Sequence, residues 1–226
     1  MTIKLIHGNI FTSSCKTIVN TVNCEGVMGA GLALECRFRY PDMYNQYVEI
    51  CDKEQLKIGM LWLYKSDDKW VLNFPTKKHW RYPSKEEYLS LGLKKFVSTY
   101  KERGITSIAF PMLGADRGGL SASLSLKIMR EYLDNLDIEI EIYKYDPSAH
   151  DDLYQIVKDK LLSQSPESIA HQTNIRINYV KKVVESMQDP TIVQMNQLGN
   201  IKGIGVKTLE KLFQFSCSET QLGLGL

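Results

Sequence analysis

The most constraining feature of the sequence is the alternation of short β-rich runs with longer amphipathic runs over residues 3–145. This order is typical of an α/β domain whose sheet is largely internal. The run 107–112 is almost wholly apolar and predicts a buried central strand. Ser84, with Glu87 three residues later, predicts a capped start for the following helix. The expected strands cover 3–6, 16–21, 60–65, 70–74, 107–112 and 138–144, and the expected helices cover 29–39, 42–53, 85–102 and 121–133.

The alternation stops at the sequence Asp-Pro-Ser-Ala-His over 146–150, and no convincing strand follows it. We therefore expect one α/β domain over 1–147 and a small helical domain over 148–226. Helices are expected to begin near Ser165, Asn178 and Lys207. The last residues, 216–226, lack periodicity and are expected to be a mobile tail.

Composition and charge exclude several classes of protein. The chain has 226 residues, of which 43% are hydrophobic and 24% charged, as in ordinary globular proteins. Its net charge of +2 is too small to indicate a nucleic-acid binder by itself. No apolar run approaches the roughly 20 residues that span a bilayer, so we expect a soluble cytoplasmic protein with no membrane partner. The five cysteines form no Cys-x-x-Cys pair, and neither a disulfide framework nor a metal site is predicted.

A first polar and glycine-rich segment follows the expected strand 16–21. Asn20 and Asn23 place short amides at the strand's carboxyl end, and a glycine-rich turn over 26–31 then opens a helix. Amide side chains beside free backbone N–H groups suit a ligand that contains a sugar and a diphosphate. The alternative is a tight strand-to-helix connection that needs glycine for its backbone conformation.

A second glycine-rich segment, Leu-Gly-Ala-Asp-Arg-Gly-Gly-Leu over 113–120, also lies between a buried strand and a helix. Two such loops at the same edge of a sheet can enclose a diphosphate between their amides. Asp116 would repel phosphate, which predicts a role on an uncharged part of the ligand. The alternative role for Asp116 is that of a helix cap or turn residue.

A third segment, over 74–83, combines cationic and aromatic side chains between a strand and a helix. Such a surface can contact phosphates and stack on bases. We expect it to contact nucleic acid, and the alternative is an ordinary solvated loop with Trp80 in the core. The expected DNA contacts are Lys78, His79, Trp80 and Arg81.

The C-terminal region carries two weaker DNA-binding patterns. Residues 201–209 resemble the hairpin of a helix-hairpin-helix module, in which Gly203, Gly205 and Lys207 would face a phosphate. Residues 168–187 loosely resemble a helix-turn-helix without its usual turn glycine. Both patterns also fit plain connections between helices.

Taken together, the segments over 7–10, 20–32 and 113–120 resemble the macrodomain family. The resemblance covers about residues 1–145 and implies a three-layer α/β/α fold with a mixed central sheet and a crevice for ADP-ribose. The implied ADP-ribose contacts are His7, Gly8, Asn9, Ile10, Asn20, Asn23, Val27, Met28, Gly29, Gly31, Leu32, Thr76, Leu113, Gly114, Ala115, Arg117, Gly118, Gly119 and Leu120. Asn9 departs from the family, which often has an aspartate there that contacts adenine.

Within the family, the segments 73–81 and 113–120 are most similar to one branch. This branch contains the DarG-like DNA ADP-ribosyl glycohydrolases, which are antitoxins, and also the terminal ADP-ribose glycohydrolases. That similarity implies Lys77 and Asp116 as catalytic residues, with no cofactor. It implies removal of ADP-ribose from DNA bases, most readily thymidine, and reversal of a modification made by a DarT-type toxin. The C-terminal region is too short to match the segment by which such antitoxins restrain a toxin.

Three other activities remain compatible with these residues. The same pair could remove ADP-ribose from protein carboxylates. The domain could instead be a non-catalytic ADP-ribose reader. Dephosphorylation of ADP-ribose 1″-phosphate is a further alternative that would not require Lys77.

Overall fold

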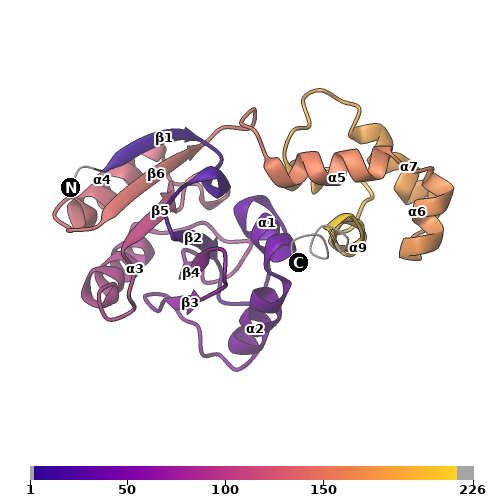
Figure 1. Ribbon diagram of the computed structural model, residues 1–226. Helices are drawn as coiled ribbons and strands as arrows, with labels where there is room; N and C mark the ends of the chain where they lie inside the picture. The colour runs from indigo at the N-terminus through magenta and orange to yellow at the C-terminus, as the bar shows by residue number, and fades with distance from the viewer. Residues whose placement is uncertain (1–2, 218–226) are drawn as a thin grey trace. The chain divides into compact units, whose positions relative to one another are not determined.

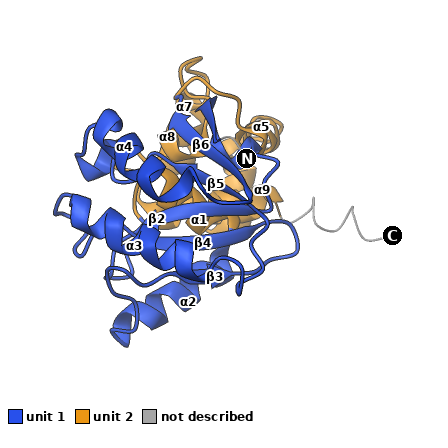
Figure 2. Cartoon of the chain, turned by 90° about the vertical axis from the view of Figure 1, so that its left-hand side faces the viewer, with its two compact units in different colours: residues 1–28, 40–146 blue, residues 29–39, 147–226 orange. Residues whose placement is uncertain are grey.

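The computed structural model describes residues 3–217 and divides the chain into two compact units, coloured separately in Figure 2. The first unit contains residues 1–28 and 40–146, and the second contains 29–39 and 147–226. Residues 29–39 therefore group with the C-terminal residues, which the sequence did not indicate. The expected mobile tail lies outside the described residues from 218 onward. Independent folding of domains 1–147 and 148–226 stays a prediction.

The first unit is an α/β structure around one mixed six-stranded sheet in the order β1-β6-β5-β2-β4-β3 (Figure 1). All neighbouring strands are parallel except β3, which pairs antiparallel with β4. The α/β class and the mixed sheet are confirmed. The elements are β1 (Lys4–Gly8), η1 (Ile10–Thr12), β2 (Thr17–Val22), α2 (Pro41–Asp52), β3 (Trp62–Tyr64), β4 (Trp70–Pro75), α3 (Glu86–Thr99), β5 (Ser107–Pro111), η2 (Asp116–Gly118), α4 (Ala122–Leu133) and β6 (Glu139–Tyr145).

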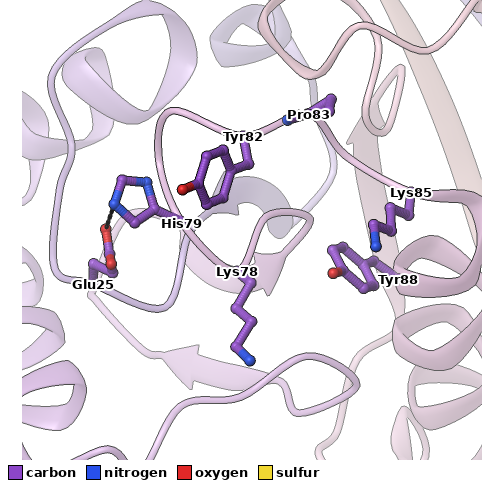
Figure 3. Close-up of a pocket in the computed structure, with 7 residues that line it drawn as sticks. All are labelled: Glu25, Lys78, His79, Tyr82, Pro83, Lys85 and Tyr88. Carbon is purple, nitrogen blue, oxygen red and sulfur yellow. Dashed lines mark ion pairs between the residues drawn. The ribbon is translucent and has the colours of Figure 1, made fainter.

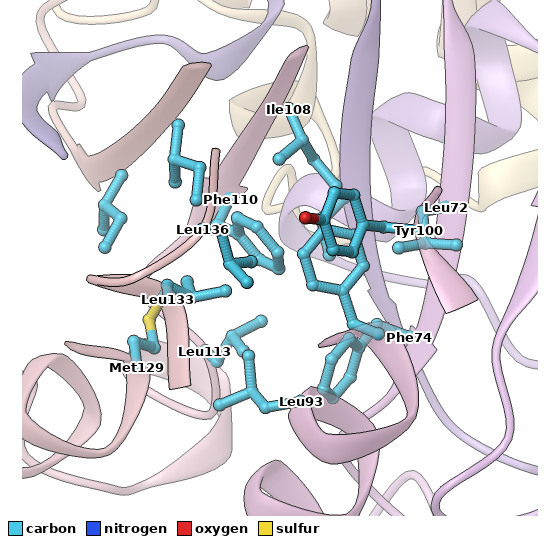
Figure 4. Close-up of a cluster of buried hydrophobic side chains, with 14 of the residues drawn as sticks. Leu72, Phe74, Leu93, Tyr100, Ile108, Phe110, Leu113, Met129, Leu133 and Leu136 are labelled. Atoms are coloured by element: carbon cyan, nitrogen blue, oxygen red, sulfur yellow. The ribbon is translucent and has the colours of Figure 1, made fainter. Parts of the chain in front are cut away.

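The core of the first unit joins α3 and α4 to the sheet (Figure 4). Phe110 of β5 is fully buried, which confirms the expected central strand, and its ring meets Phe96 of α3 edge to face. Gly92 lets α3 approach β4 closely, because an added Cβ there would lie 2.2 Å from the Phe74 ring. Phe74 is followed by Pro75, Thr76 and Lys77, so this packing fixes the strand that leads into the predicted site.

One local prediction about this unit is wrong. Ser84 does not cap α3, since Lys85 occupies the N-cap position and no side chain caps the helix. The Ser84 hydroxyl is buried and has no hydrogen-bond partner among the residues that the structure describes, and the Ser84 backbone N–H donates to the carbonyl of Gly118 at 2.9 Å. A long-range backbone contact therefore replaces the expected local one.

The second unit is helical and has its own apolar core, to which Leu34 and Phe38 of α1 contribute. The Phe38 ring stacks on Phe213 of α9 with 5.8 Å between centroids. The expected helices near Ser165, Asn178 and Lys207 are present, whereas α5 and α8 were not predicted. The elements are α1 (Gly31–Arg39), α5 (Asp152–Leu162), α6 (Pro166–Thr173), α7 (Ile177–Ser186), α8 (Met195–Leu198) and α9 (Val206–Cys217).

A buried ion cluster fastens α1 to the C-terminal helices within this unit. The Arg39 guanidinium lies 2.9 Å from both the Glu35 and Asp151 carboxylates. Asp151 also caps α5 by accepting from the N–H groups of Leu153 and Tyr154, and it accepts from the N–H of Met195. Burial raises the pKa of Glu35 to about 7, although Arg39 opposes the shift. None of the described helices is long and apolar enough to cross a membrane.

Candidate functional site

The loops that follow β2, β4 and β5 meet at one edge of the sheet. These three strands are parallel and lie side by side, so their carboxyl ends share that edge. Backbone hydrogen bonds join the loops: the N–H of Cys24 donates to Lys78 O at 3.3 Å, and the N–H of Ser84 donates to Gly118 O at 2.9 Å. Gly118 packs closely on Ser84, because an added Cβ would lie 2.7 Å from the Ser84 hydroxyl oxygen, which would have to move.

Asn23 organises the first of these loops. Its Nδ2 donates to Val27 O at 2.6 Å, and its Oδ1 accepts from the Glu25 N–H at 2.9 Å. The Tyr47 hydroxyl of α2 donates to Asn23 O at 2.8 Å, and burial raises the pKa of that phenol, which keeps it protonated. The amide predicted to bind a ribose therefore also holds the turn that follows it.

Lys77 lies after β4, and its amine reaches the third loop. The Nζ atom donates a hydrogen bond to the backbone carbonyl of Arg117, the residue after Asp116. Burial and the positive charge of Arg117 lower the pKa of Lys77. The two residues implied as catalytic are thus joined through adjacent positions of one loop.

Asp116 has a backbone conformation that is uncommon for a residue with a side chain. Its φ is +45°, in the left-handed region, and its side chain is exposed at the start of η2. Non-glycine residues in this region cost free energy and are concentrated at functional sites, although aspartate and asparagine tolerate it best. Gly114 and Gly119 on either side have φ of +67° and +82°. Asp116 therefore lies exposed in a tight turn and does not cap a helix with its side chain, so its alternative role as a turn residue stays open.

Asn20 lies deeper than the other amides. It is fully buried and donates from Nδ2 to Asn73 Oδ1 at 2.9 Å, across the paired strands β2 and β4. It also approaches the sulfur of Met28 at 3.9 Å. Sequence reasoning missed Asn73, although an amide within the otherwise apolar run 70–75 was a signal for it. This pair joins the two strands from which the first two loops leave. Within the described residues, Asn20 Oδ1 and Asn73 Nδ2 make no hydrogen bond.

The end of β1 supplies the other part of the resemblance to macrodomains. Asn9 is buried and caps η1, its Oδ1 accepting from the Phe11 N–H at 3.1 Å. Ile10 is buried as well, whereas His7 is exposed and Gly8 is half-buried. The Asn9 amide therefore has a structural task in addition to the predicted contact with the ligand.

The remaining predicted ligand residues differ in exposure and in the unit that holds them. Gly29, Gly31 and Leu32 fall in the second unit, and the others fall in the first. In the first unit, Thr76, Met28, Leu113, Gly114 and Gly118 are buried, Ala115 and Leu120 are half-buried, and Val27, Arg117 and Gly119 are exposed.

The basic and aromatic residues after Lys77 form an exposed surface. Trp80 is 44% exposed, so the alternative that places it in the core is wrong. Its ring stacks near His79, and the Arg81 guanidinium lies 4.6 Å from its centroid. Lys78 is exposed and His79 is half-buried. In the second unit, Gly203, Gly205 and Lys207 are exposed in the turn and first residues of α9.

Comparison with known proteins decides the family. The family model described as Macro domain matches residues 19–129, which include all three loops. The solved macrodomain of Thermus aquaticus DarG is 38% identical, with a TM-score of 0.60, and the match covers 63% of this chain and 98% of that one. The chain belongs to the macrodomain family. The macrodomain of Mycobacterium tuberculosis DarG is similarly related, at 37% identity and a TM-score of 0.58 over 63% of this chain and 97% of that one.

A curated relative of this macrodomain protein is named DNA ADP-ribosyl glycohydrolase. It comes from Thermus aquaticus and is 38% identical over 159 residues, which are 69% of this chain and 44% of the relative. The chain spans less than half the length of the curated glycohydrolases that it matches. Within residues 3–217, no three His, Cys, Asp or Glu side chains are grouped to hold a metal ion.

Proposed function

We propose that this macrodomain protein is a DNA ADP-ribosyl glycohydrolase in which Lys77 and Asp116 perform the chemistry. The observation that carries the proposal is the hydrogen bond from Lys77 Nζ to the loop that presents Asp116. The identity to proteins named DNA ADP-ribosyl glycohydrolase supports the choice of substrate. A relative from Thermosipho africanus is named a DNA ADP-ribosyl transferase–glycohydrolase fusion, which supports a DNA ADP-ribosyltransferase as the cognate partner. We further propose that the partner is a toxin and that both proteins act in the cytoplasm.

The reaction breaks the bond between C1″ of the distal ribose and a nitrogen of the base. Water supplies a hydroxyl group to C1″ and a proton to the departing base, through a transition state with positive charge on the sugar. In one route, a neutral Lys77 amine attacks C1″ as the bond to the base breaks, and water then displaces the amine from C1″. In the other route, the amine removes a proton from a hydroxyl group and passes it to the departing base. The Asp116 carboxylate stabilises the positive charge or carries the proton. The loop over 113–120 contributes backbone N–H groups to the diphosphate.

Release of ADP-ribose from DNA tests this function directly. The substrate is a single-stranded oligonucleotide with one ADP-ribosylated thymidine, and chromatography measures free ADP-ribose. Release by the full chain is expected. Saturable binding of ADP-ribose without release from thymidine- or guanosine-linked DNA would contradict the proposal and favour a reader, and release from protein carboxylates alone would favour the protein hydrolase.

The pH dependence of turnover follows from the lowered pKa of Lys77. A lowered pKa leaves a larger fraction of the amine neutral at a given pH, and that fraction grows as pH rises toward the ordinary value of 10.5. The kcat for ADP-ribose release is therefore expected to rise with pH and to level off below pH 10.5. Single-turnover rates at a series of pH values, with substrate saturating, measure this limb. A flat profile would remove the neutral amine from the mechanism.

A further inference from the structure

A pocket of about 480 Å³ opens beside the Lys77 segment and is used by no step of the proposed reaction (Figure 3). It is built from the loop after β4, the first turn of α3 and one residue of the first loop. His79 and Tyr82 lie on one side of it, and Lys85 and Tyr88 lie on the other (Figure 3). Its lining residues are Glu25, Lys78, His79, Tyr82, Pro83, Lys85 and Tyr88.

The aromatic side chains of this pocket are available to a flat ligand. Tyr82 is 64% exposed, and its ring centroid lies 4.7 Å from that of His79. The two rings are tilted by 35°, so they support one another without closing both faces. Tyr88 on the facing side is only half-buried. Exposed aromatic faces of this kind stack on unpaired nucleic-acid bases, with about 1–3 kcal/mol per base.

The charges of the pocket favour an anionic ligand. Lys78 and Lys85 are exposed cations at its edge. Among the described residues that line the pocket, Glu25 is the one carboxylate, and its oxygen lies 3.4 Å from His79 Nε2, a contact that orients the imidazole. The Arg81 N–H donates to His79 Nδ1 at 3.1 Å, so both ring nitrogens are held. A ligand with a flat ring and a nearby phosphate fits this combination.

The pocket is fixed relative to the catalytic lysine by the backbone. Lys78 follows Lys77, and its carbonyl accepts from the Cys24 N–H, while the Ser84 N–H bonds to Gly118 at the far end of the loop. The loop over 78–83 is thus tethered at both ends to the segments around Lys77 and Asp116. A strand whose modified base reaches Lys77 therefore passes this pocket with a neighbouring nucleotide.

We propose that this pocket binds one unmodified nucleotide that neighbours the ADP-ribosylated nucleotide in single-stranded DNA. Tyr82 and Tyr88 stack on the base, and Lys78 and Lys85 contact its phosphates. The role of the neighbouring nucleotide rests on the proposed function, but the pocket's affinity for single-stranded DNA is measurable without it. Under this proposal, Tyr82, Lys85 and Tyr88 make the protein prefer a modified oligonucleotide to a single modified nucleoside.

Fluorescence anisotropy with a labelled, unmodified single-stranded oligonucleotide tests the pocket in the full chain. We expect Tyr82→Ala to weaken binding by at least about fivefold, as for the loss of one stacked base. Lys85→Gln is expected to reduce the dependence of affinity on salt by about 0.7 in the log–log slope, as for one phosphate contact with a single strand. Leu91→Ala, at an exposed position of α3 outside the pocket, is the control and is expected to bind like the original protein.

Turnover separates this proposal from the general function. Tyr82→Ala is expected to lower kcat/KM for a modified oligonucleotide while leaving kcat/KM for ADP-ribosylated thymidine nucleoside unchanged. If both Tyr82→Ala and Lys85→Gln kept the original affinity for the oligonucleotide and unfolded at the original temperature, the proposed role of the pocket would be wrong. The same conclusion would follow if Tyr82→Ala and Lys85→Gln lost affinity for an acidic peptide but kept their affinity for the oligonucleotide. If the original protein releases no ADP-ribose from any DNA, the proposed function is wrong. The anisotropy measurements still show whether the pocket binds single-stranded DNA.

Discussion

The Lys77→Met variant is expected to lose at least about 100-fold in kcat for release of ADP-ribose from DNA, the lower end of what a positioned base or nucleophile contributes. Methionine keeps most of the apolar stem and removes the amine that donates to Arg117 O. The dissociation constant for free ADP-ribose should change little, because backbone groups of the loops are expected to hold the diphosphate. Single-turnover kinetics and titration calorimetry measure the two quantities.

Lys94→Met is the matched control for this prediction, since Lys94 is an exposed lysine of α3 outside the site. Asp116→Asn tests the second proposed catalytic residue by removing its charge while keeping a side chain that tolerates φ of +45°. Asp116→Ala would be harder to interpret, because alanine tolerates a positive φ less well than asparagine. That variant would disturb the backbone as well as remove the carboxylate. Turnover by both Lys77→Met and Asp116→Asn within threefold of the original rate would remove the catalytic assignment.

The order of strands and helices in the first unit was predictable because its signals are local. Apolar runs and the residues that end them lie next to one another in sequence, as in the buried strand that ends at Pro111. Glycines mark the turns, as Gly104 does with its positive φ between α3 and β5. The same local signals failed at Ser84, where a backbone contact with Gly118 prevailed over the capping pattern.

The sequence proposes residues for the candidate site but does not predict their contacts. The resemblance to macrodomains pointed to Lys77 and Asp116, yet nothing in the sequence pairs Lys77 with a carbonyl 40 positions away. Asn73 was missed for a related reason, since its partner Asn20 is set by strand register. Such contacts depend on how elements pack, which composition and periodicity do not specify.

The partners of α1 were the largest feature that the sequence did not predict. Its helix was expected, but an amphipathic pattern does not say which surface covers its apolar face. In the structure, Leu34 and Phe38 belong to the core of the second unit. The N-cap Asp151 and the apolar spacing after it were also available as signals for α5, and they went unused.

Removal of the Arg39 charge is expected to destabilise the second unit strongly. In Arg39→Met, Glu35 and Asp151 lose their shared cation, although their side chains are only 2% and 0% exposed. Breaking a buried ion cluster by removing one partner costs about 3–5 kcal/mol, because the remaining charges are left uncompensated. Chemical denaturation followed by far-ultraviolet circular dichroism, which reports the helices, measures the loss. Arg37→Met, which breaks a pair with Glu210, is the control and should cost less, because the Glu210 carboxylate is 24% exposed and stays partly solvated.

The pH dependence of this loss distinguishes an uncompensated charge from lost packing. Burial raises the folded-state pKa of Glu35 to about 7, above its ordinary 4.5, so its contribution to stability is full below pH 4.5 and declines as pH rises through 7. Arg39 opposes that shift, and its removal should raise the pKa further and extend the decline to higher pH. Arg39→Met should therefore regain stability as pH falls from 7 toward 5, and adding Glu35→Leu should restore part of it at pH 7, because Asp151 keeps its three backbone N–H donors. Equal losses in Arg39→Met and Arg37→Met, unaffected by pH, would mean that the cluster contributes only packing.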